Sequence, residues 1–526
     1  MLSFLVALCQ AGEPEVPWTR LAPTALSLSV PLSPEAQQAL ADRDHAAAVA
    51  ALQKMPRADI PGNSLADYEF LLAWSLQRAG RTSEAVPMVD AVRQAQNAPP
   101  AYVEMLVGEL MMADGKYLEA SQVLEKVDSG AVWVRARLAL AEAYNRLERL
   151  ADARAIYTEL AARPDPSPGS ATALYMLAQR STPAEAAEYS RRLYRYYPGT
   201  AEEKGAPLAS PTLADIAARG DTLQEKGDFS GAISLLSARL GEVSGKDATG
   251  CQYRYAYGRA QQKSSNLSTA VEILGPIGKS CKGIDDDRAA KALYLAGKSQ
   301  ERKKEWASAA GYYRQIPELY PAHSMADDGY TLGGIALQEA GDLAGARTLW
   351  SKGLKAYPSG DLAAETAWRL AWGAALAGDV TEAIRQADEA RDQVESRYDM
   401  THWLASAYWA GRWRAWPTND KNFSEEKKKE AADLLEAVAI QAPWHYYGAL
   451  AWARLNALDS SRASAIKRPV QDPDSDPWQV RDAWMAEPAV RNALGLVRVG
   501  LYGDALTEFS TLEEEELSGS EMAIIT

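Results

Sequence analysis

The stretch 324–358, SMADDGYTLGGIALQEAGDLAGARTLWSKGLKAYP, constrains the fold more than any other part of the sequence. Tyr330 and Leu337 are seven residues apart, so they share one face of a first helix. Gly341 suits the left-handed position that ends a helix, and Pro358 predicts the end of a second helix. The stretch therefore predicts two antiparallel helices joined by a tight turn.

Small and large side chains are phased between these two predicted helices. Gly334 has no side chain, so the second helix can approach closely there, and Ala346 is the small residue expected opposite it. Trp350 is expected to fill the space one turn later. Glycine, alanine, tryptophan and proline at this spacing are typical of a tetratricopeptide repeat, a helix–turn–helix of about 34 residues.

The same phasing recurs along the chain. It predicts a first set of repeats over 36–198 and a second set over 212–456, separated by the polar connection 199–211. No segment shows sustained two-residue alternation, so strands are not expected. Because each hairpin would pack only on its neighbours, we expect an all-α fold: a right-handed superhelix of tetratricopeptide-like hairpins, or α-solenoid.

Both ends of the chain differ from the repeats. Residues 1–12, an apolar run followed by small residues, are typical of a secretory signal peptide, although a basic start is missing and a plain apolar N-terminus is the alternative. Residues 13–35, rich in proline and serine, predict a tether. The polar segment 457–478 predicts a linker, and 479–526 predicts a last hairpin that stops at the opening of another amphipathic helix. No run is long enough for a membrane span.

The net charge and the spacing of potential ligand residues exclude several classes of partner and site. A net charge of −14 argues against nucleic acid and against anionic membranes. The four histidines have no metal-ligand spacing, and the glycines around 275–280 lack the spacing of a phosphate-binding loop. We therefore expect no catalytic residue, no cofactor site and no metal site in this chain.

Two cysteines lie beyond the signal-like segment. Cys251 is expected to start the first helix of a hairpin and Cys281 to follow the second, so both lie on the same side of that hairpin. A disulfide is geometrically possible and would fit an oxidising compartment. Two free thiols in a reduced protein are the alternative.

Aromatic residues are concentrated late in the chain. Indole faces stack on sugar rings, so this part is a candidate glycan track, while packing between repeats is the alternative. The candidate contact residues are Trp403, Trp409, Trp413, Trp444, Tyr446 and Tyr447.

Residues 443–455, PWHYYGALAWARL, carry a resemblance to a known family. Proline, clustered aromatics, glycine and a small-apolar run at the end of an α-superhelix resemble soluble lytic murein transglycosylases. The hairpins ending YYRQIPELYPAH and LWSKGLKAYPSG resemble the repeats of that family, and 487–512 lies where its linker domain would. The resemblance implies a U- or ring-shaped helical region that embraces peptidoglycan glycan strands in the periplasm, in a larger cell-wall complex.

The catalytic part of that family is not matched. Its catalytic glutamate lies in a Glu-Ser motif followed by a Gly-Leu-Met-Gln stretch, whereas Glu395-Ser396 is followed here by RYDMTHW. No catalytic residue is therefore carried over. The main hypothesis is the non-catalytic scaffold region of a periplasmic lytic transglycosylase. The alternative is a stand-alone tetratricopeptide adaptor that binds a peptide or protein in its concave groove. An enzyme with its own site has no constellation of residues to support it.

Overall fold

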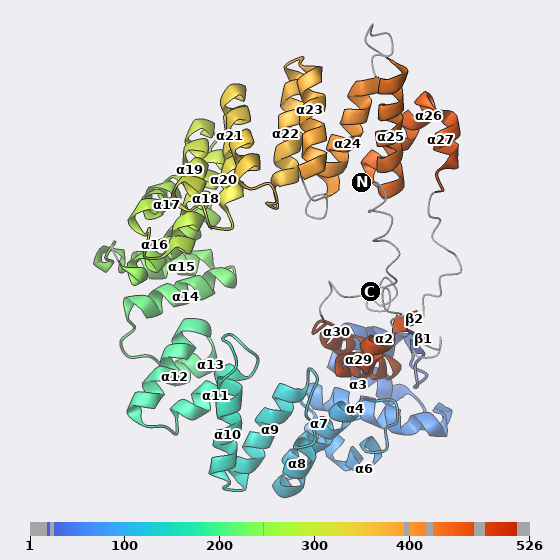
Figure 1. Cartoon of the computed structure of the whole chain (residues 1–526). Helices are drawn as coiled ribbons and strands as arrows, with labels where there is room; N and C mark the ends of the chain where they lie inside the picture. The colour runs from blue at the N-terminus through green and yellow to red at the C-terminus, as the bar shows by residue number, and fades with distance from the viewer. Residues whose placement is uncertain are drawn as a thin grey trace. The chain divides into compact units, whose positions relative to one another are not determined.

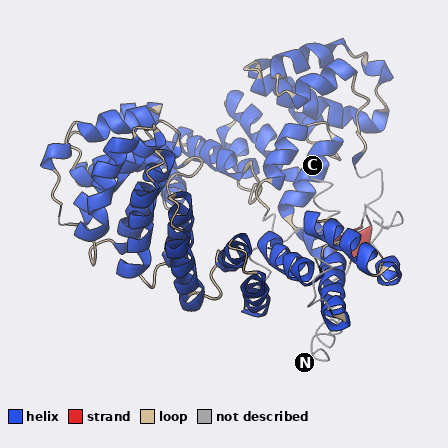
Figure 2. Cartoon of the chain, turned by 90° about the horizontal axis from the view of Figure 1, so that it is seen from above, coloured by secondary structure: helices blue, strands red, loops and turns tan. Residues whose placement is uncertain are grey.

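The computed structural model describes residues 18–20, 26–245, 247–393, 400–415, 424–467 and 479–512. Apart from two short strands, the elements in these residues are helices (Figures 1 and 2). The chain forms two compact units. Unit 1 comprises Met1–Leu193, Gly199–Pro207 and Asp474–Thr526, and unit 2 comprises Tyr194–Pro198 and Leu208–Pro473.

Unit 1 combines N-terminal hairpins with the C-terminal end of the chain. Its helices and strands are β1 (Trp18–Arg20), α2 (Pro34–Ala41), α3 (His45–Lys54), η2 (Arg57–Asp59), η3 (Gly62–Ser64), α4 (Leu65–Arg78), α5 (Thr82–Ala85), η4 (Val86–Met88), α6 (Val89–Val92), α7 (Pro100–Ala113), α8 (Tyr117–Leu124), α9 (Trp133–Arg146), α10 (Leu150–Ala161), α11 (Ser170–Ala178), α12 (Pro183–Tyr196) up to Leu193, α13 (Ala201–Gly205), β2 (Gln479–Arg481), α28 (Asp482–Ala486), α29 (Pro488–Arg498) and α30 (Tyr502–Phe509).

Unit 2 is a row of helix hairpins. Its helices are α14 (Leu213–Glu225), α15 (Phe229–Ser237), η5 (Leu240–Glu242), α16 (Ala248–Lys263), α17 (Leu267–Ser280), α18 (Asp286–Arg302), α19 (Trp306–Leu319), α20 (Ala326–Glu339), α21 (Leu343–Ala356), α22 (Ala363–Leu376), α23 (Val380–Gln393), α24 (Met400–Ala415), α25 (Glu425–Gln441), α26 (Tyr446–Leu458) and α27 (Ser460–Ala465). The fold is thus an all-α repeat superhelix.

One packing rule recurs in five hairpins. A glycine on the first helix lies directly beneath a large side chain sixteen positions later on the second, so the two helices can approach closely. The pairs are Gly108 with Leu124, Gly220 with Leu236, Gly258 with Leu274, Gly297 with Tyr313, and Gly334 with Trp350.

The packing of α20 on α21 differs from the expected packing in one detail. A methyl group at Gly334 would lie 2.1 Å from Nε1 of Trp350, so the indole, and not Ala346, lies opposite this glycine. The Trp350 N–H donates to the carbonyl of Thr331 at 3.0 Å, which holds the ring in place. Helix α21 ends at Ala356, two residues before Pro358.

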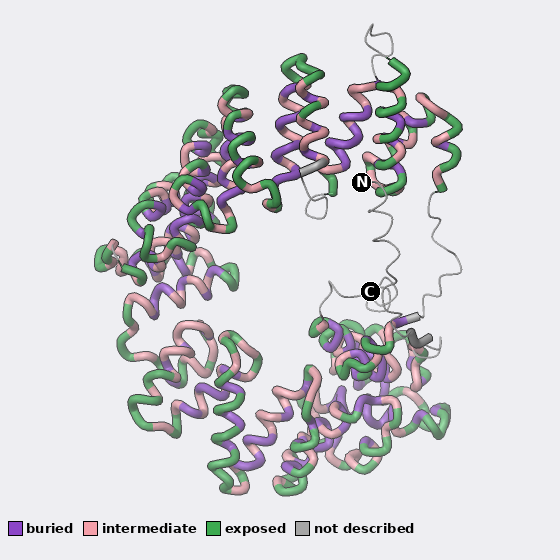
Figure 3. The backbone as a smooth tube through the Cα atoms, in the orientation of Figure 1, coloured by how far each residue is buried: buried purple, intermediate pink, exposed green. Residues whose placement is uncertain are grey.

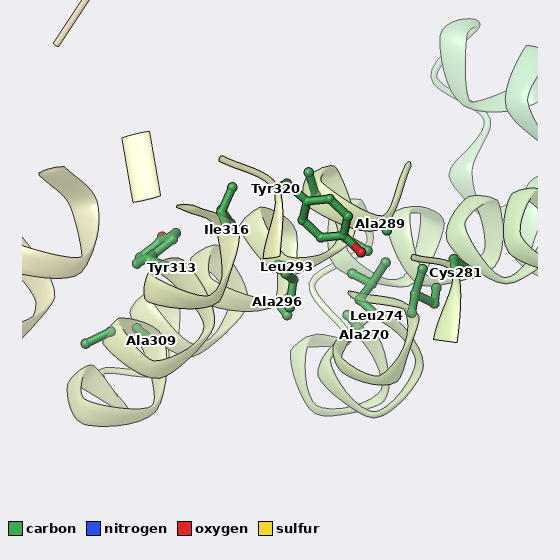
Figure 4. Packing of buried hydrophobic residues seen from close by; sticks show 14 of the residues in the cluster. Ala270, Leu274, Cys281, Ala289, Leu293, Ala296, Ala309, Tyr313, Ile316 and Tyr320 are labelled. Carbon is green, nitrogen blue, oxygen red and sulfur yellow. The ribbon is translucent and has the colours of Figure 1, made fainter. Parts of the chain in front are cut away.

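The core of unit 2 is continuous from α16 to α20. Alanine, leucine and tyrosine side chains from successive helices interlock there (Figure 4). Cys251 and Cys281 belong to this cluster, are fully buried, and are joined by a disulfide with their Cα atoms 5.9 Å apart. The bond ties the start of α16 to the end of α17.

The C-terminal end of the chain packs on the N-terminal helices within unit 1. Strands β1 and β2 pair antiparallel, with Thr19 opposite Val480, so the expectation of no strands was wrong at this place. Arg498 accepts the backbone N–H of Ser29 at 2.7 Å, and Val30 is fully buried. The segment 13–35 is therefore not a free tether in its described part, because a partner far away in sequence covers it.

A buried carboxylate stabilises this packing of the C-terminal end on the N-terminal helices. Glu508 on α30 is fully buried. Its Oε1 accepts the hydroxyl of Tyr102 at 2.7 Å and the backbone N–H of Ala131 at 2.9 Å. Asn492 on α29 lies within 3.5 Å of the same oxygen. Residues some 400 positions apart thus share one hydrogen-bonded centre.

The predicted linker 457–478 also differs in its described part. Helix α27 occupies Ser460–Ala465, because Asp459 caps it by accepting the N–H groups of Ser461 and Arg462. Trp452 donates to the carbonyl of Ala463 at 3.0 Å and fixes the short helix on α26. The signal-like segment 1–12, the pair Glu395-Ser396 and residues 513–526 lie outside the described residues.

Candidate binding faces on the first helices of unit 2

The first helices of most successive hairpins pack on one another, and we call this row of first helices the inner layer. Helix α14 contacts α16, α16 contacts α18, α22 contacts α24, and α24 contacts α26. Figure 3 shows buried residues alternating with half-buried and exposed ones along most of the helices. The half-buried residues on this layer are the ones that a ligand lying across several repeats could reach.

Aromatic rings gather on the late part of this layer. We call Trp368, Trp372, Trp409, Trp413 and Tyr447 the aromatic face. Trp372 is its centre, with ring centroids 5.2 Å from Trp368, 5.0 Å from Trp409 and 6.3 Å from Trp413. Tyr408 lies 5.5 Å from Trp409 and 5.6 Å from Tyr447, so it links α24 to α26.

Spacing on the helices explains this arrangement. Trp368 and Trp372 are four residues apart on α22, and Trp409 and Trp413 are four apart on α24, so each pair shares a helix face. The direct contact of α22 with α24 then brings the two pairs together. All five members of the aromatic face are half-buried.

The structure divides the predicted contact residues into two kinds. Trp403, Trp409 and Tyr447 pack partly on the core of the last hairpins, and Trp413 packs on Ala371, Ala387 and Ala410. Trp444 and Tyr446 instead are 70% and 68% exposed. Packing between repeats therefore describes four of these six rings, and glycan contact stays a prediction.

Trp368 and Trp372 were not among the predicted contact residues. The signal that could have found them is their four-residue spacing on the first helix of a hairpin, which repeats that of Trp409 and Trp413. Their meeting across two hairpins depends on how α22 packs on α24, which the spacing alone does not give.

The early part of the inner layer is polar. We call Asp221, Gln252, Tyr255, Arg259 and Arg288 the polar face; these residues come from α14, α16 and α18. Gln252 donates to Asp221 at 3.1 Å. Burial raises the pKa of Asp221, although the hydrogen bond from Gln252 and the charges of Arg288 and Arg259 oppose the rise. Burial likewise raises the pKa of Tyr255.

This polar face offers donors to an anionic or amide ligand. Arg259 and Arg288 lie within electrostatic range of Asp221, and Arg288 also pairs with Asp285 at 2.7 Å. Guanidinium groups recognise carboxylates and backbone carbonyls. The rings of the aromatic face can stack on a ligand, and the guanidinium groups of the polar face can donate hydrogen bonds to one.

Unit 1 has a separate cavity of about 760 Å³ beside α7 and α8. Its lining mixes apolar and charged groups, among them Arg93, Val103, Met111, Gln122 and Lys126. Arg93 donates to the sulfur of Met111 at 3.7 Å. The cavity is a second place where a side chain of a partner could enter.

The described helices are too short or too polar to cross a bilayer. The tetratricopeptide repeat family matches residues 291–323, which cover most of α18 and the whole of α19. No curated protein matches the chain. The chain therefore carries a tetratricopeptide repeat, in a fold that serves protein-binding scaffolds.

Three solved structures resemble parts of the chain. The crystal structure of MamA is 19% identical, with 33% of this chain and 93% of that chain covered, and a TM-score of 0.27. The human IFIT1 dimer with PPP-AAAA is 14% identical, with 81% and 95% covered and a TM-score of 0.33. The BtubC structure from P. vanneervenii is 17% identical, with 42% and 90% covered and a TM-score of 0.29. No function is drawn from these likenesses.

Proposed function

We propose that this protein is a scaffold that binds an extended segment of a partner protein along the inner layer of unit 2. The observation that carries the proposal is the aromatic face, a row of half-buried rings on consecutive first helices. Rings at such spacing present apolar area at low conformational cost, while indole N–H groups can hydrogen-bond a peptide backbone. Repeat superhelices bind along this kind of layer.

A second ligand is favoured by a specific feature at the end of the layer. Trp444 and Tyr446 expose flat rings beside α26, within the stretch that resembles soluble lytic murein transglycosylases. Exposed aromatic planes stack on sugar rings, which supports glycan strands of peptidoglycan as the second candidate. In that case the chain would be the non-catalytic scaffold region of a periplasmic cell-wall enzyme.

We also propose that the protein is exported to the periplasm. The signal-like composition of 1–12 and the buried Cys251–Cys281 disulfide support this location, because disulfides persist in oxidising compartments. Mass spectrometry of protein recovered from its native compartment tests it. Two free thiols would contradict export.

Peptide selection tests the main proposal. A phage-displayed library of random 12-residue peptides is panned on the protein and on the Trp372→Ala variant. We expect enriched peptides that bind the wild type with micromolar Kd and bind Trp372→Ala at least about tenfold more weakly. Absence of enrichment, or equal binding to the variant, would contradict a peptide site on the aromatic face.

Sedimentation with purified insoluble peptidoglycan tests the second candidate. The matched pair is Trp444→Ala, which removes an exposed ring, and Trp403→Phe, which keeps a half-buried one. Loss of sedimentation in Trp444→Ala alone would identify a glycan site at α26. No sedimentation of the wild type would leave the peptide scaffold.

A further inference from the structure

Three aspartates from two successive hairpins meet in unit 2. Asp327 and Asp328 lie in the first turn of α20, and Asp361 lies just before α22. One carboxylate oxygen from each lies within 4.8 Å of the other two. This is about the largest separation of two oxygens that both contact one Ca²⁺ ion at roughly 2.4 Å.

The repeat length explains why Asp327 and Asp361 lie close together. Asp327 and Asp361 are 34 positions apart, which is the length of a tetratricopeptide repeat. They therefore occupy equivalent positions in consecutive hairpins, and stacking of the hairpins brings them together. A sequence scan for metal ligands does not find such a pair, because the spacing exceeds that of any local motif.

One oxygen of one of the three carboxylates is buried without a hydrogen-bond partner. Asp327 is 9% exposed, and its Oδ2 atom is buried and accepts no hydrogen bond. A buried polar atom left in this way costs free energy, so a ligand at this oxygen would remove an existing penalty. The other two aspartates are more accessible, with Asp361 exposed, so a cation has a route from solvent.

Gly360 leaves room in front of that oxygen. A methyl group built on Gly360 would lie 2.3 Å from Oδ2 of Asp327. Any other residue at position 360 would therefore crowd this atom. The glycine thus keeps open the space that faces the unpartnered oxygen.

Positive charge near the three aspartates is engaged elsewhere. In the described residues no ion pair includes Asp327, Asp328 or Asp361. Lys298 pairs with Glu301 at 3.2 Å, and His323 lies 3.3 Å from Asp287. Lys298 and His323 lie within electrostatic range of Asp328, but both contact these other carboxylates. No ion pair therefore neutralises the three aspartates in the described part of the chain.

We propose that Asp327, Asp328 and Asp361 form a binding site for a hard divalent cation, Ca²⁺, between consecutive hairpins. Carboxylate oxygens without nitrogen or sulfur ligands suit Ca²⁺, and water completes the shell on the side of Asp361. The ion joins the start of α20 to the loop before α22, so it stiffens the step from one repeat to the next. This proposal stands apart from the proposed peptide or glycan binding.

Calcium titration tests the site directly. Protein passed over a chelating resin is titrated with CaCl₂ by calorimetry, and its melting temperature is followed with and without CaCl₂. We expect one site and a higher melting temperature, because an ion that binds only the folded state stabilises it. Asp361→Asn and Gly360→Ala should each weaken binding by at least about tenfold.

Terbium luminescence places the ion. The carbonyl of Tyr357 accepts the backbone N–H of Gly360 at 3.2 Å, and the ring centroid of Tyr357 lies 6.1 Å from that of Tyr330. These two phenols are therefore the candidate sensitisers for an ion at the three aspartates. Excitation of tyrosine should sensitise bound Tb³⁺, with a signal that CaCl₂ displaces. Loss of the signal in Tyr357→Phe would support the location.

Control variants distinguish the loss of the Ca²⁺ site from a general loss of stability. Gly311→Ala is the matched control for Gly360→Ala, because a methyl group at Gly311 meets nothing within 4 Å; it should bind Ca²⁺ like the wild type. Asp361 is exposed and Asp361→Asn removes one of three like charges, so without metal the variant should melt no lower than the wild type. The proposal is overturned if the wild type shows no binding at millimolar CaCl₂, or if both variants bind with unchanged Kd.

Discussion

The polar face and the aromatic face of unit 2 lie on different hairpins of the same architecture, and they expose different kinds of side chain. In both regions the first helices pack on one another, and in both a small residue on the first helix lets the second approach. The polar face places Asp221 and Arg288 on this layer, whereas the aromatic face places Trp372 against Trp409. The difference shows that the packing positions define the superhelix and that the remaining first-helix positions are free to define the ligand.

The two regions also differ in how they are held together. The polar region contains the Cys251–Cys281 disulfide, while the sequence has no cysteine between Cys281 and its end. The aromatic region depends on ring contacts and on the core of α24, α25 and α26. Breaking each kind of contact should therefore affect one region more than the other.

Removal of the disulfide is expected to have the largest effect. The Cys251→Ala/Cys281→Ala double variant opens a loop of 30 residues, which should cost about 3–4 kcal/mol of unfolding free energy on the chain-entropy model. Hydrogen exchange should rise in α16 and α17 and stay unchanged in α24 and α26. Equal loosening of both regions would show that they unfold as one unit.

Overpacking at Gly334 should have the next largest effect. Gly334→Leu drives a side chain into the ring of Trp350 and should cost about 1–3 kcal/mol. Hydrogen exchange should increase in α20 and α21 and in the hairpins on either side, because stability in such arrays depends on nearest neighbours. Gly311→Ala, placed in open space, is the control, and no local change in Gly334→Leu would contradict the repeat packing.

Substitutions on the two faces should differ more in their effect on the Kd for a peptide than in their effect on stability. With a peptide selected on the wild type, Trp372→Ala should weaken binding about tenfold, which equals about 1.4 kcal/mol. Tyr255→Ala, on the polar face, should leave Kd within about twofold. Fluorescence titration measures both, and a larger loss in Tyr255→Ala would place the peptide site on the polar face instead.

The smallest expected effect is a pH dependence of the polar face. Burial raises the pKa of Asp221, so its contribution to stability is complete below the unfolded value of about 3.9. The contribution is lost as pH rises through the higher folded pKa. Asp221→Asn removes this dependence, so the stability of the variant relative to the wild type should rise with pH across that window.

A carboxylate in the aromatic region provides a control of opposite sign. Hydrogen bonds from Arg385 and Gln386 lower the pKa of Glu382 to about 2. Its contribution is present above the unfolded pKa of about 4.3 and is lost as pH falls toward 2. Denaturant melts of Asp221→Asn and Glu382→Gln at several pH values should therefore diverge from the wild type in opposite directions.

The sequence by itself determined the helical repeats. The phasing of Gly334, Gly341 and Pro358 predicted the hairpin, because cap geometry, close approach and helix termination act within a few residues of one another. It also located the aromatic region, because the aromatic residues are concentrated late in the chain. The exported location and the glycan or peptide ligand stay predictions.

Only the tertiary structure decided which residues meet across hairpins. It placed Trp350 opposite Gly334, brought Trp372 to the centre of the aromatic face, and joined Asp327 to Asp361. It also paired β1 with β2 and buried Glu508 against Tyr102, which lies 406 positions away. The physical reason is that helix propensity and periodicity are local, whereas these contacts depend on how whole hairpins stack, and no short stretch of sequence records that stacking.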